Sequence, residues 1–336
     1  MEGRSHPGND FYVDGTEHTP VILITGAGGY IGRRLVQALR ARGEAVRALD
    51  RDGAALEALV GPGVEPLVAD AGDASALAAA LAGVEVVYHL AGSALGSPAA
   101  IMRSNVGAAR ALSAACAGRR LRALVFASSG ALYPSGSGWL TEETPPAPAF
   151  HYARAKAEAE RVLLEAHHRD GTPTQIARIA AVYGPDSPAL MIAQVRRGRF
   201  PLIGGGKGYA SNIHLDDLTA ALLALPERGQ AGRIYNLADD EPAPIREFYG
   251  YLADLLGAPP PPALHPLAGH VLVRLFGLIG RLRGRPNPLP VDLVAMASVS
   301  HRMANRRMRE ELEVQLRYPS YREGLPAALA LEVKLM

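Results

Sequence analysis

The sequence predicts an α/β fold, in which a doubly wound parallel sheet is followed by a smaller mixed C-terminal domain. Apolar stretches typical of strands alternate with helical stretches from residue 21 to about residue 179, as in a parallel sheet covered by helices. The first stretch, Val21 to Thr25, is a continuous apolar run, as expected for a strand buried on both faces. After Pro185 the alternation weakens, and clusters of Gly and Pro interrupt the chain.

The elements of the sheet follow in order. After the first strand, apolar residues from Ile31 to Leu39 recur at helical spacing, and Gly43 ends that helix. Further strands are expected at 45–49, 64–69, 84–90, 121–127 and 174–179. The intervening stretches predict helices at about 74–82, 98–117 and 150–168.

Composition and charge exclude several classes of protein. The chain has 336 residues, is 48% hydrophobic and carries a formal net charge of +2, so it is neither disordered nor a strongly cationic nucleic-acid binder. Cys116 is the only cysteine, which excludes a disulfide scaffold and favours a reducing, cytoplasmic location. No stretch has the roughly 18 uninterrupted apolar residues of a membrane-spanning helix.

The most apolar stretch, Leu267 to Leu282 within 267–284, is interrupted by His270, Arg274 and Arg281. We interpret it as a lid or domain-packing helix. The alternative is a helix that lies on a membrane surface or against an apolar partner.

A glycine-rich turn follows the first predicted strand. Gly26, Gly29 and Gly32 fit the pattern G-x-x-G-x-x-G between a strand and a helix, the context that a dinucleotide-binding turn requires. Glycines let the backbone approach a pyrophosphate, and the helix N-terminus offers free N–H donors. The sheet is therefore expected to be Rossmann-type. The cofactor-binding residues predicted in this turn are Gly26, Gly28, Gly29, Tyr30, Ile31 and Gly32.

Acidic residues end the next two strands. Asp50 follows Gly32 by 18 residues, where a carboxylate can accept hydrogen bonds from the adenosine ribose and repel a 2′-phosphate. This position favours NAD. Arg51 favours NADP, because a guanidinium group binds phosphate well, so NADP stays open. Asp70 and Ala71 are expected to border the adenine, or to form a strand-end turn.

A tyrosine and a lysine four residues apart begin the helix expected at 150–168. Tyr152 and Lys156 would share one helix face, where the ammonium group lowers the pKa of the phenol. Ser128 and Ser129 lie at the end of the strand upstream, where a hydroxyl can hold a substrate oxygen against the tyrosine. The Tyr-x-x-x-Lys spacing alone also occurs on exposed helices, so this prediction depends on the glycine turn.

Together these motifs resemble the extended short-chain dehydrogenase/reductase family, the group of NAD-dependent epimerases and dehydratases, over about residues 20–330. The resemblance is carried by Thr25-Gly26-x-x-Gly29-x-x-Gly32, Val87 to Gly92, Asn105-Val106-Gly107, Ser128-Ser129, Tyr152-x-x-x-Lys156, Arg178 with Val182 to Pro185, and His214 to Asp217. It implies that Tyr152 is the general acid/base, that Lys156 holds the nicotinamide ribose, and that Ser129 orients the substrate oxygen, with Ser128 as the fallback. It also implies that Leu90, Ala91 and Gly92 line the cofactor cleft and that Asn105 is a structural or relay residue.

We expect the chain to divide into two domains with the site between them. Residues 1–19 form a flexible extension, 20–185 with 209–239 form the dinucleotide-binding domain, and 186–208 with 240–332 form the substrate-binding domain. The expected partner is a small-molecule substrate, with no nucleic acid and no metal. The resemblance is compatible with a homodimer.

Two positions depart from the sugar-nucleotide members of this family. Those enzymes usually carry an asparagine at the position of Ala181 and an arginine at that of Ala210, and both contact the substrate diphosphate. An apolar side chain cannot replace a charge-assisted bond to phosphate. We therefore expect an NAD(P)-dependent oxidoreductase of a secondary alcohol or ketone. The alternatives are a sugar-nucleotide epimerase or dehydratase with tightly bound NAD, and a non-catalytic dinucleotide-sensing protein.

Overall fold

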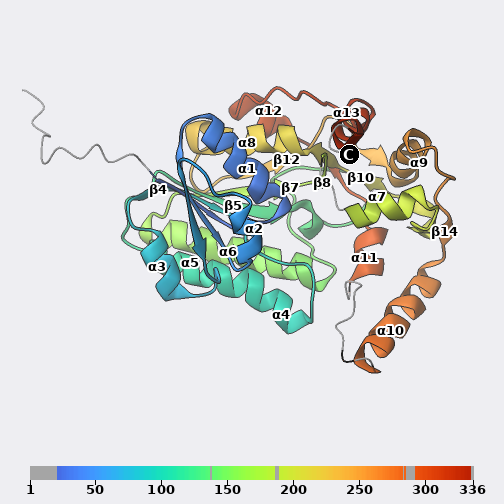
Figure 1. The fold of residues 1–336 in the computed structure, drawn as a ribbon, viewed down its shortest axis with the longest axis horizontal. Coiled ribbons are helices and arrows are strands. Elements are labelled where there is room, and N and C mark those ends of the chain that lie inside the picture. The colour runs from blue at the N-terminus through green and yellow to red at the C-terminus, as the bar shows by residue number, and fades with distance from the viewer. Residues whose placement is uncertain (1–20, 137, 186–188, 283, 285–291, 334–336) are drawn as a thin grey trace, which may run out of the picture.

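A seven-stranded parallel sheet lies at the centre of the molecule, as the sequence predicts (Figure 1). The computed structural model describes residues 21–136, 138–185, 189–282, 284 and 292–333, and the extension expected at 1–19 lies outside them. The strand order is β12-β7-β5-β4-β1-β2-β3, and every neighbouring pair is parallel. The strands are β1 Val21–Thr25, β2 Ala45–Asp50, β3 Val64–Val68, β4 Val84–His89, β5 Ala123–Ser129, β7 Thr174–Ile179 and β12 Ile234–Leu237.

The strand order reverses at β1. From β1 the chain adds β2 and β3 on one side, then crosses to β4 and continues outward through β5, β7 and β12 on the other. Such a reversal leaves a crevice beyond the carboxyl ends of the strands, where open α/β sheets bind ligands. The last strand, β12, comes from the segment 209–239 and pairs with β7. The division of the chain into two domains stays a prediction.

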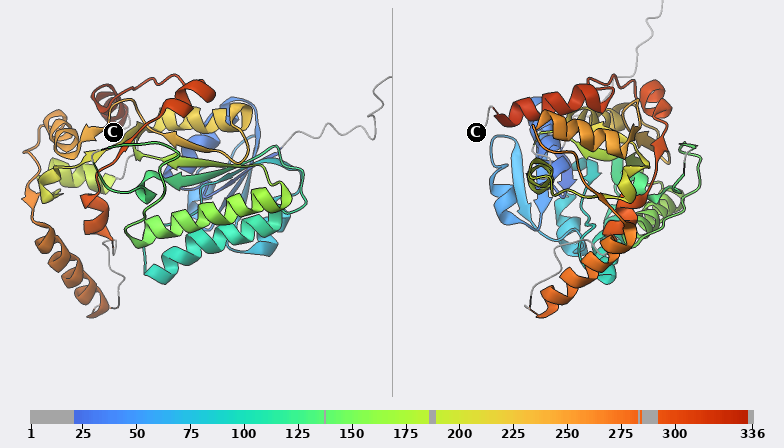
Figure 2. Two further views of the ribbon diagram at one scale, coloured as in Figure 1. Left: turned by 180° about the vertical axis from the view of Figure 1, so that it is seen from behind. Right: turned by 90° about the vertical axis from the view of Figure 1, so that its right-hand side faces the viewer.

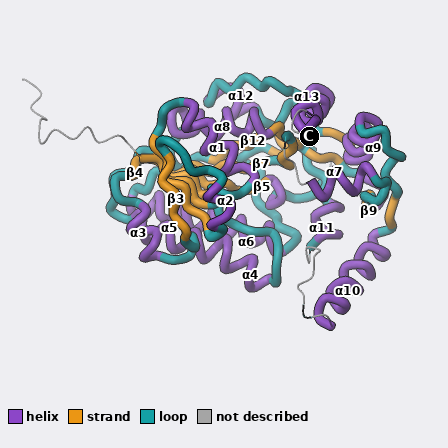
Figure 3. The backbone as a smooth tube through the Cα atoms, viewed as in Figure 1, coloured by secondary structure: helices purple, strands orange, loops and turns teal. Residues whose placement is uncertain are grey.

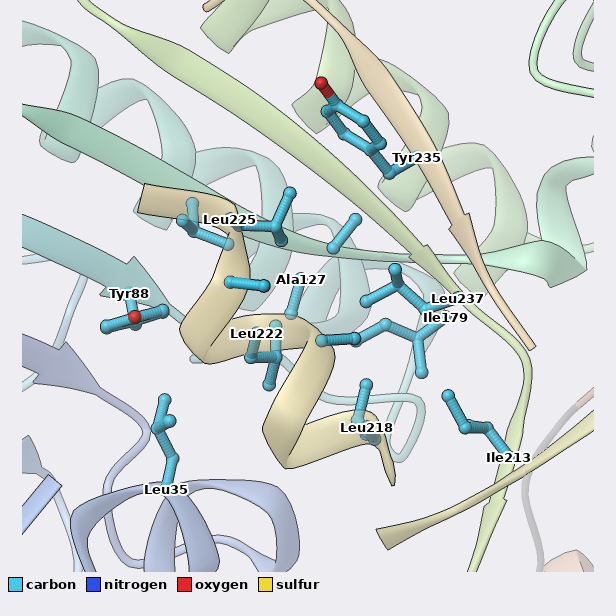
Figure 4. Close-up of a cluster of buried hydrophobic side chains, with 14 of the residues drawn as sticks. Leu35, Tyr88, Ala127, Ile179, Ile213, Leu218, Leu222, Leu225, Tyr235 and Leu237 are labelled. Atoms are coloured by element: carbon cyan, nitrogen blue, oxygen red, sulfur yellow. The ribbon is translucent and has the colours of Figure 1, made fainter. Parts of the chain in front are cut away.

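Helices cover both faces of the sheet (Figures 1 and 2). Their bounds are α1 Tyr30–Ala41, α2 Gly53–Glu57, α3 Ala74–Ala80, α5 Ala108–Cys116, α6 His151–Asp170 and α8 Leu215–Arg228. Helices α1 and α8 pack side by side on one face, where Leu35 and Leu222 belong to one apolar cluster (Figure 4). Helices α3, α5 and α6 cover the other face, where Leu77 and Leu163 belong to a second cluster. The strands are therefore buried on both sides.

Several elements begin or end one or two residues away from their expected bounds, and one expected helix is divided. Strand β5 ends two residues later than expected, so that Ser128 and Ser129 both belong to it. The helix expected at 98–117 consists of α4 (Pro98–Met102) and α5, joined by a π-helical turn at Arg103–Gly107. Such turns are frequent at functional sites.

Short strands and helices make up the rest of the described chain (Figure 3). They are β6 Trp139–Leu140, β8 Ala181–Tyr183, α7 Ala189–Arg196, β9 Leu202–Ile203, β10 Tyr209–Ala210, β11 Asn212–His214, β13 Ala243–Pro244, α9 Ile245–Leu255, β14 Ala263–Leu264, α10 Pro266–Leu282, α11 Leu293–Ser298, β15 Arg302–Met303, α12 Arg306–Glu311 and α13 Tyr321–Val333. The short strands pair two by two, and a third apolar cluster around Phe248 and Tyr321 joins α9 to α13. Within the described residues, no helix is both long enough and apolar enough to cross a membrane.

Candidate active site

A cleft of about 670 Å³ opens at the carboxyl ends of β1 to β4, where the strand order reverses. Predicted cofactor-binding residues from all four strand ends line it: Gly26, Gly29, Asp50, Arg51, Asp70, Ala71, Leu90, Ala91 and Gly92. The helices and π-helical turn that follow β4 also line the cleft with residues that the sequence analysis missed: Ala100, Arg103, Ser104, Gly107 and Ala108. These residues could not be identified from the sequence, because the helical pattern of this segment does not indicate which helix face borders a ligand. The part of the chain that the structure describes contains no group of three His, Cys, Asp or Glu residues able to hold a metal ion.

The glycine turn depends on close backbone approach. A Cβ at Gly26, whose φ is +76°, would lie 2.7 Å from the backbone nitrogen of Ala91. A Cβ at Gly32 would lie 2.2 Å from the carbonyl oxygen of Gly26. Gly29 is the N-cap of α1, and this helix has no side-chain cap. A helix N-terminus without a side-chain cap can bind an anion at the wall of the cleft.

Asp50 both borders the cleft and holds the turn. Its Oδ2 accepts a hydrogen bond of 3.0 Å from the N–H of Gly28, and its Oδ1 accepts one of 3.1 Å from the N–H of Asp52. Asp70 similarly accepts a bond of 2.7 Å from the N–H of Gly72. Carboxylates and Arg51 at the rim, with the N-terminus of α1 at the turn, fit the ribose hydroxyls and phosphates of a dinucleotide.

Six predicted cofactor residues do not line the cleft: Tyr152 and Lys156 on α6, and four residues in and after the glycine turn, Gly28, Tyr30, Ile31 and Gly32. Gly28 contacts Asp50, and Ile31 packs against the apolar core beside α1. The Tyr30 hydroxyl lies beside Gly184, since a Cβ added to that glycine would be 3.3 Å from the hydroxyl oxygen. The last four residues shape the turn and its helix, and the expected contact of all six with the cofactor stays a prediction.

Ser129 lies beside Tyr152, as expected from the sequence. Tyr152 is half-buried in the first turn of α6, and its hydroxyl forms a hydrogen bond with Ser129 at the end of β5. Burial raises the pKa of Tyr152 to about 12, and the bond with Ser129 offsets this only in part. With this pKa the phenol keeps its proton at neutral pH. The expected lowering of the Tyr152 pKa by Lys156 stays a prediction.

Lys156 is buried one turn further along α6. Its Nζ donates a hydrogen bond of 2.8 Å to the carbonyl oxygen of Ala127 and lies 5.9 Å from the centre of the Tyr152 ring. The ammonium group is therefore held by β5 rather than by the phenol. Burial lowers the pKa of Lys156 to about 8, although the charge of Glu160 acts in the opposite direction.

Ser128 contacts a different set of residues from its neighbour. Its hydroxyl donates a hydrogen bond to Glu160, which also forms a buried ion pair with Arg178 at 2.8 Å. Successive side chains of a strand point to opposite faces, so only one of the two serines can face Tyr152. In this structure Ser129 is the serine beside Tyr152, and its contact with a substrate oxygen stays a prediction.

Asn105 holds the loop that follows β4. Its Nδ2 donates bonds of 2.9 Å to the carbonyl oxygens of Ser93 and Ile101. A Cβ at Gly92 would lie 2.5 Å from Oδ1 of Asn105 and 3.2 Å from Nζ of Lys156. The end of the cleft at Gly92 therefore lies directly beside Lys156, which joins the cofactor cleft to the predicted acid/base group.

Asp292 is a site residue that the sequence analysis missed. Its Oδ1 lies 2.8 Å from Nδ1 of His151, and its Oδ2 accepts a hydrogen bond of 3.3 Å from the backbone N–H of Tyr152. Helix α6 has no side-chain cap at its N-cap residue, Phe150. The buried Asp292 carboxylate supplies this cap from 140 residues away. No local sequence signal could have indicated the contact.

The model of the NAD dependent epimerase/dehydratase family matches residues 22–238. The chain belongs to this family. It therefore has the Rossmann-type fold of the extended short-chain dehydrogenases/reductases, and it is an enzyme.

Similar proteins include reductases and dehydratases. The chain is 31% identical to a 4-hydroxy-2-methyl-3-oxo-4-farnesyl-3,4-dihydroquinoline-1-oxide ketoreductase of Stigmatella aurantiaca, over 70% of this chain and 73% of that protein. It is 32% identical to a 3-diazoavenalumate denitrifying reductase of a Streptomyces species, over 90% of this chain and 98% of that protein. A crystal structure of dTDP-glucose 4,6-dehydratase from Streptomyces venezuelae, with NAD bound, superposes with a TM-score of 0.78 at 23% identity, covering 94% and 97% of the two chains. This last likeness concerns the fold.

Proposed function

We propose that this enzyme interconverts a ketone and a secondary alcohol of low charge by hydride transfer with NAD(P). The observation that carries the proposal is the hydrogen-bonded pair Ser129 and Tyr152, which lies next to Lys156 and the Gly92 end of the cleft. A ketone oxygen placed against this pair would meet two hydroxyl donors.

The proposed roles follow from the protonation states. In the reductive direction Tyr152 donates its phenolic proton to the carbonyl oxygen, while Ser129 holds that oxygen by a hydrogen bond. Lys156 stabilises the phenolate that remains on Tyr152. When bound, the nicotinamide nucleotide supplies the hydride to the carbonyl carbon, or accepts it in the oxidative direction. The residues that would hold the nucleotide are Gly26, Gly29, Asp50, Arg51, Asp70, Ala71, Leu90, Ala91 and Gly92.

The low charge of the proposed substrate rests on two alanines. Ala181 opens β8 opposite Asn212 of β11, and Ala210 of β10 lies opposite Ala243. Neither side chain can bind a diphosphate. The similarity to a ketoreductase that acts on a farnesylated quinoline oxide supports an apolar ketone as the substrate class.

The second candidate is a sugar-nucleotide epimerase or dehydratase that keeps its NAD bound through the cycle. The family and the fold of the dTDP-glucose dehydratase favour it, whereas the two alanines do not. The third alternative, a non-catalytic dinucleotide sensor, has least support because Ser129, Tyr152 and Lys156 are all present and close together.

A reduction assay tests the proposal. The protein is mixed with NADH or NADPH and a panel of apolar cyclic and β-keto ketones, and loss of reduced nucleotide is compared with alcohol formed. We expect one alcohol per nucleotide oxidised, and a loss of turnover of about 1,000-fold in Tyr152→Phe with nucleotide binding retained. Conversion of dTDP-glucose or UDP-glucose without added nucleotide, with no ketone reduced, would establish the second candidate instead.

The family resemblance also supports a cytoplasmic homodimer. The single cysteine, Cys116, is buried and unpaired, which agrees with a reducing compartment. Sedimentation of the purified chain tests the dimer, and fractionation of cells that produce it tests the location.

A further inference from the structure

Helix α10 presents an apolar stripe to its surroundings. Its members recur at spacings of three or four residues and therefore share one helix face; they are Leu267, Val271, Leu275, Leu278 and Leu282. Their exposed fractions run from 50% at Leu275 to 78% at Leu282. The helix extends away from the rest of the molecule in each view (Figures 1 and 2). An exposed apolar stripe of this length marks an interaction surface.

The opposite side of α10 is the one that packs on the protein. Gly269 and Gly280 are buried, and a Cβ at Gly269 would lie 3.0 Å from the Val294 side chain and 3.2 Å from that of Ile203. Small residues thus face α11 and β9, while the large apolar side chains face outward. A helix that served only domain packing would have the reverse arrangement. The expected lid or packing role therefore explains the buried side of α10, with Gly269 and Gly280. It does not explain the exposed apolar stripe on the other side.

Positive charge accompanies the stripe. His270 and Arg274 are exposed on α10 beside it. The sequence from Leu255 to Val291 contains no Asp or Glu, although the whole chain has 33 acidic and 35 basic residues. Its arginines are Arg274, Arg281, Arg283 and Arg285. This segment is therefore net positive because it lacks acidic residues, whereas the whole chain is nearly neutral.

We propose that α10 docks on a membrane surface that displays anionic lipid head groups. The stripe would enter the boundary between head groups and acyl chains with the helix lying in the plane of the surface, and Arg274 would meet lipid phosphates at its edge. A second copy of the chain is a poorer occupant, because two such arms would bring arginines together with no carboxylate on either arm to pair with them. The proposal concerns docking alone and does not depend on the reaction.

Flotation of the full chain with lipid vesicles tests the proposal. The vesicles contain phosphatidylcholine alone, or phosphatidylcholine with about a third phosphatidylglycerol. We expect partitioning onto the anionic vesicles that weakens as salt is raised. Val271→Glu should lower the partition coefficient by more than about tenfold, because a charge replaces buried apolar surface. Arg274→Gln should lower it by about fivefold.

The matched control is Val60→Glu, because Val60 is 59% exposed and Val271 is 65% exposed. This variant makes the same chemical change in a different surface region and should float like the unmodified chain. The proposal is overturned if the unmodified chain does not float with anionic vesicles, or if Val271→Glu floats as well as Val60→Glu. It is also overturned if Val271→Glu changes only the oligomeric state in sedimentation, since the stripe would then belong to a second copy.

Discussion

The carboxylate of Asp292 caps the helix that begins with Tyr152. Its Oδ2 accepts a hydrogen bond of 3.3 Å from the N–H of Tyr152, and its Oδ1 lies 2.8 Å from His151. Asp292 immediately precedes α11, the helix on which α10 packs. The C-terminal segment is thereby joined to the proposed acid/base group.

This contact predicts that Asp292 positions Tyr152. Asp292→Ala removes the cap and should cost about 1 kcal/mol of stability and lower kcat by roughly tenfold, with the Kd for the nucleotide unchanged. Asp292→Asn should recover most of the activity, because an amide oxygen still accepts the Tyr152 N–H. Asp254→Ala, at an exposed acid on α9, is the control. An unchanged kcat in Asp292→Ala would show that the cap does not position the tyrosine.

The pH dependence of ketone reduction should report Lys156. Its pKa is lowered to about 8 by burial, whereas that of Tyr152 is raised to about 12. As pH rises through about 8 the ammonium group is lost while the phenol keeps its proton, so the rate of reduction should fall. Lys156→Arg stays charged and should not show this fall, even if its rate is lower throughout. The same fall in Lys156→Arg would assign the titration to another group.

Asp50 should determine which nucleotide is preferred. Replacing it by Ala removes the carboxylate at the rim of the cleft and also the acceptor for the Gly28 N–H. We expect the Kd for NADH to rise by about tenfold, and that for NADPH to rise less, because repulsion of the 2′-phosphate is removed. Equal losses for both nucleotides, measured by titration, would leave Asp50 with a structural role only.

Asp239 should make the fold less stable as pH rises. Both of its carboxylate oxygens are buried, and burial raises its pKa to about 9, although a hydrogen bond from the backbone of Asn212 acts in the opposite direction. Between about pH 4 and pH 9 the unfolded chain is ionised at this residue while the folded chain is protonated, so stability falls by up to ~1.4 kcal/mol per pH unit. Below this range the residue has no such effect, and above it the loss is constant.

Asp239→Asn should therefore stabilise the protein much more at pH 8 than at pH 5. Denaturant unfolding at the two pH values measures this difference, with Asp254→Asn as the exposed control. If Asp239→Asn destabilises the protein equally at both pH values, the Asp239 side chain makes an interaction that requires a carboxylate and that an amide cannot replace.

Much of the sheet could be predicted because its information is local. The strand β1 is buried on both faces, and its sequence is apolar from Val21 to Ile24. The glycine turn combines local spacing with a fixed strand–helix context, and the four-residue spacing places Tyr152 and Lys156 on one helix face. These features depend on neighbours within a few residues, so the order of residues is enough to indicate them.

The remaining features depend on distant parts of the chain. The cap from Asp292 joins residues 140 positions apart. The position of Arg103 in the wall of the cleft depends on how α4 and α5 pack. The direction of the Tyr152 pKa shift depends on burial and on the hydrogen bond with Ser129, neither of which the spacing reveals. The apolar pattern of α10 was visible in the sequence, but its orientation away from the protein was not.

The nucleotide content of the purified protein tests the central claim most directly. The protein is prepared without added cofactor, denatured, and its released nucleotide is identified by mass and quantified against protein. The oxidoreductase proposed here exchanges its nucleotide in every turnover, so we predict a small fraction of sites filled and reversible binding of added NADH or NADPH. Nearly one NAD per chain, retained through purification and not exchanged for added NADH, would contradict the proposal and indicate the internal redox cycle of an epimerase or dehydratase.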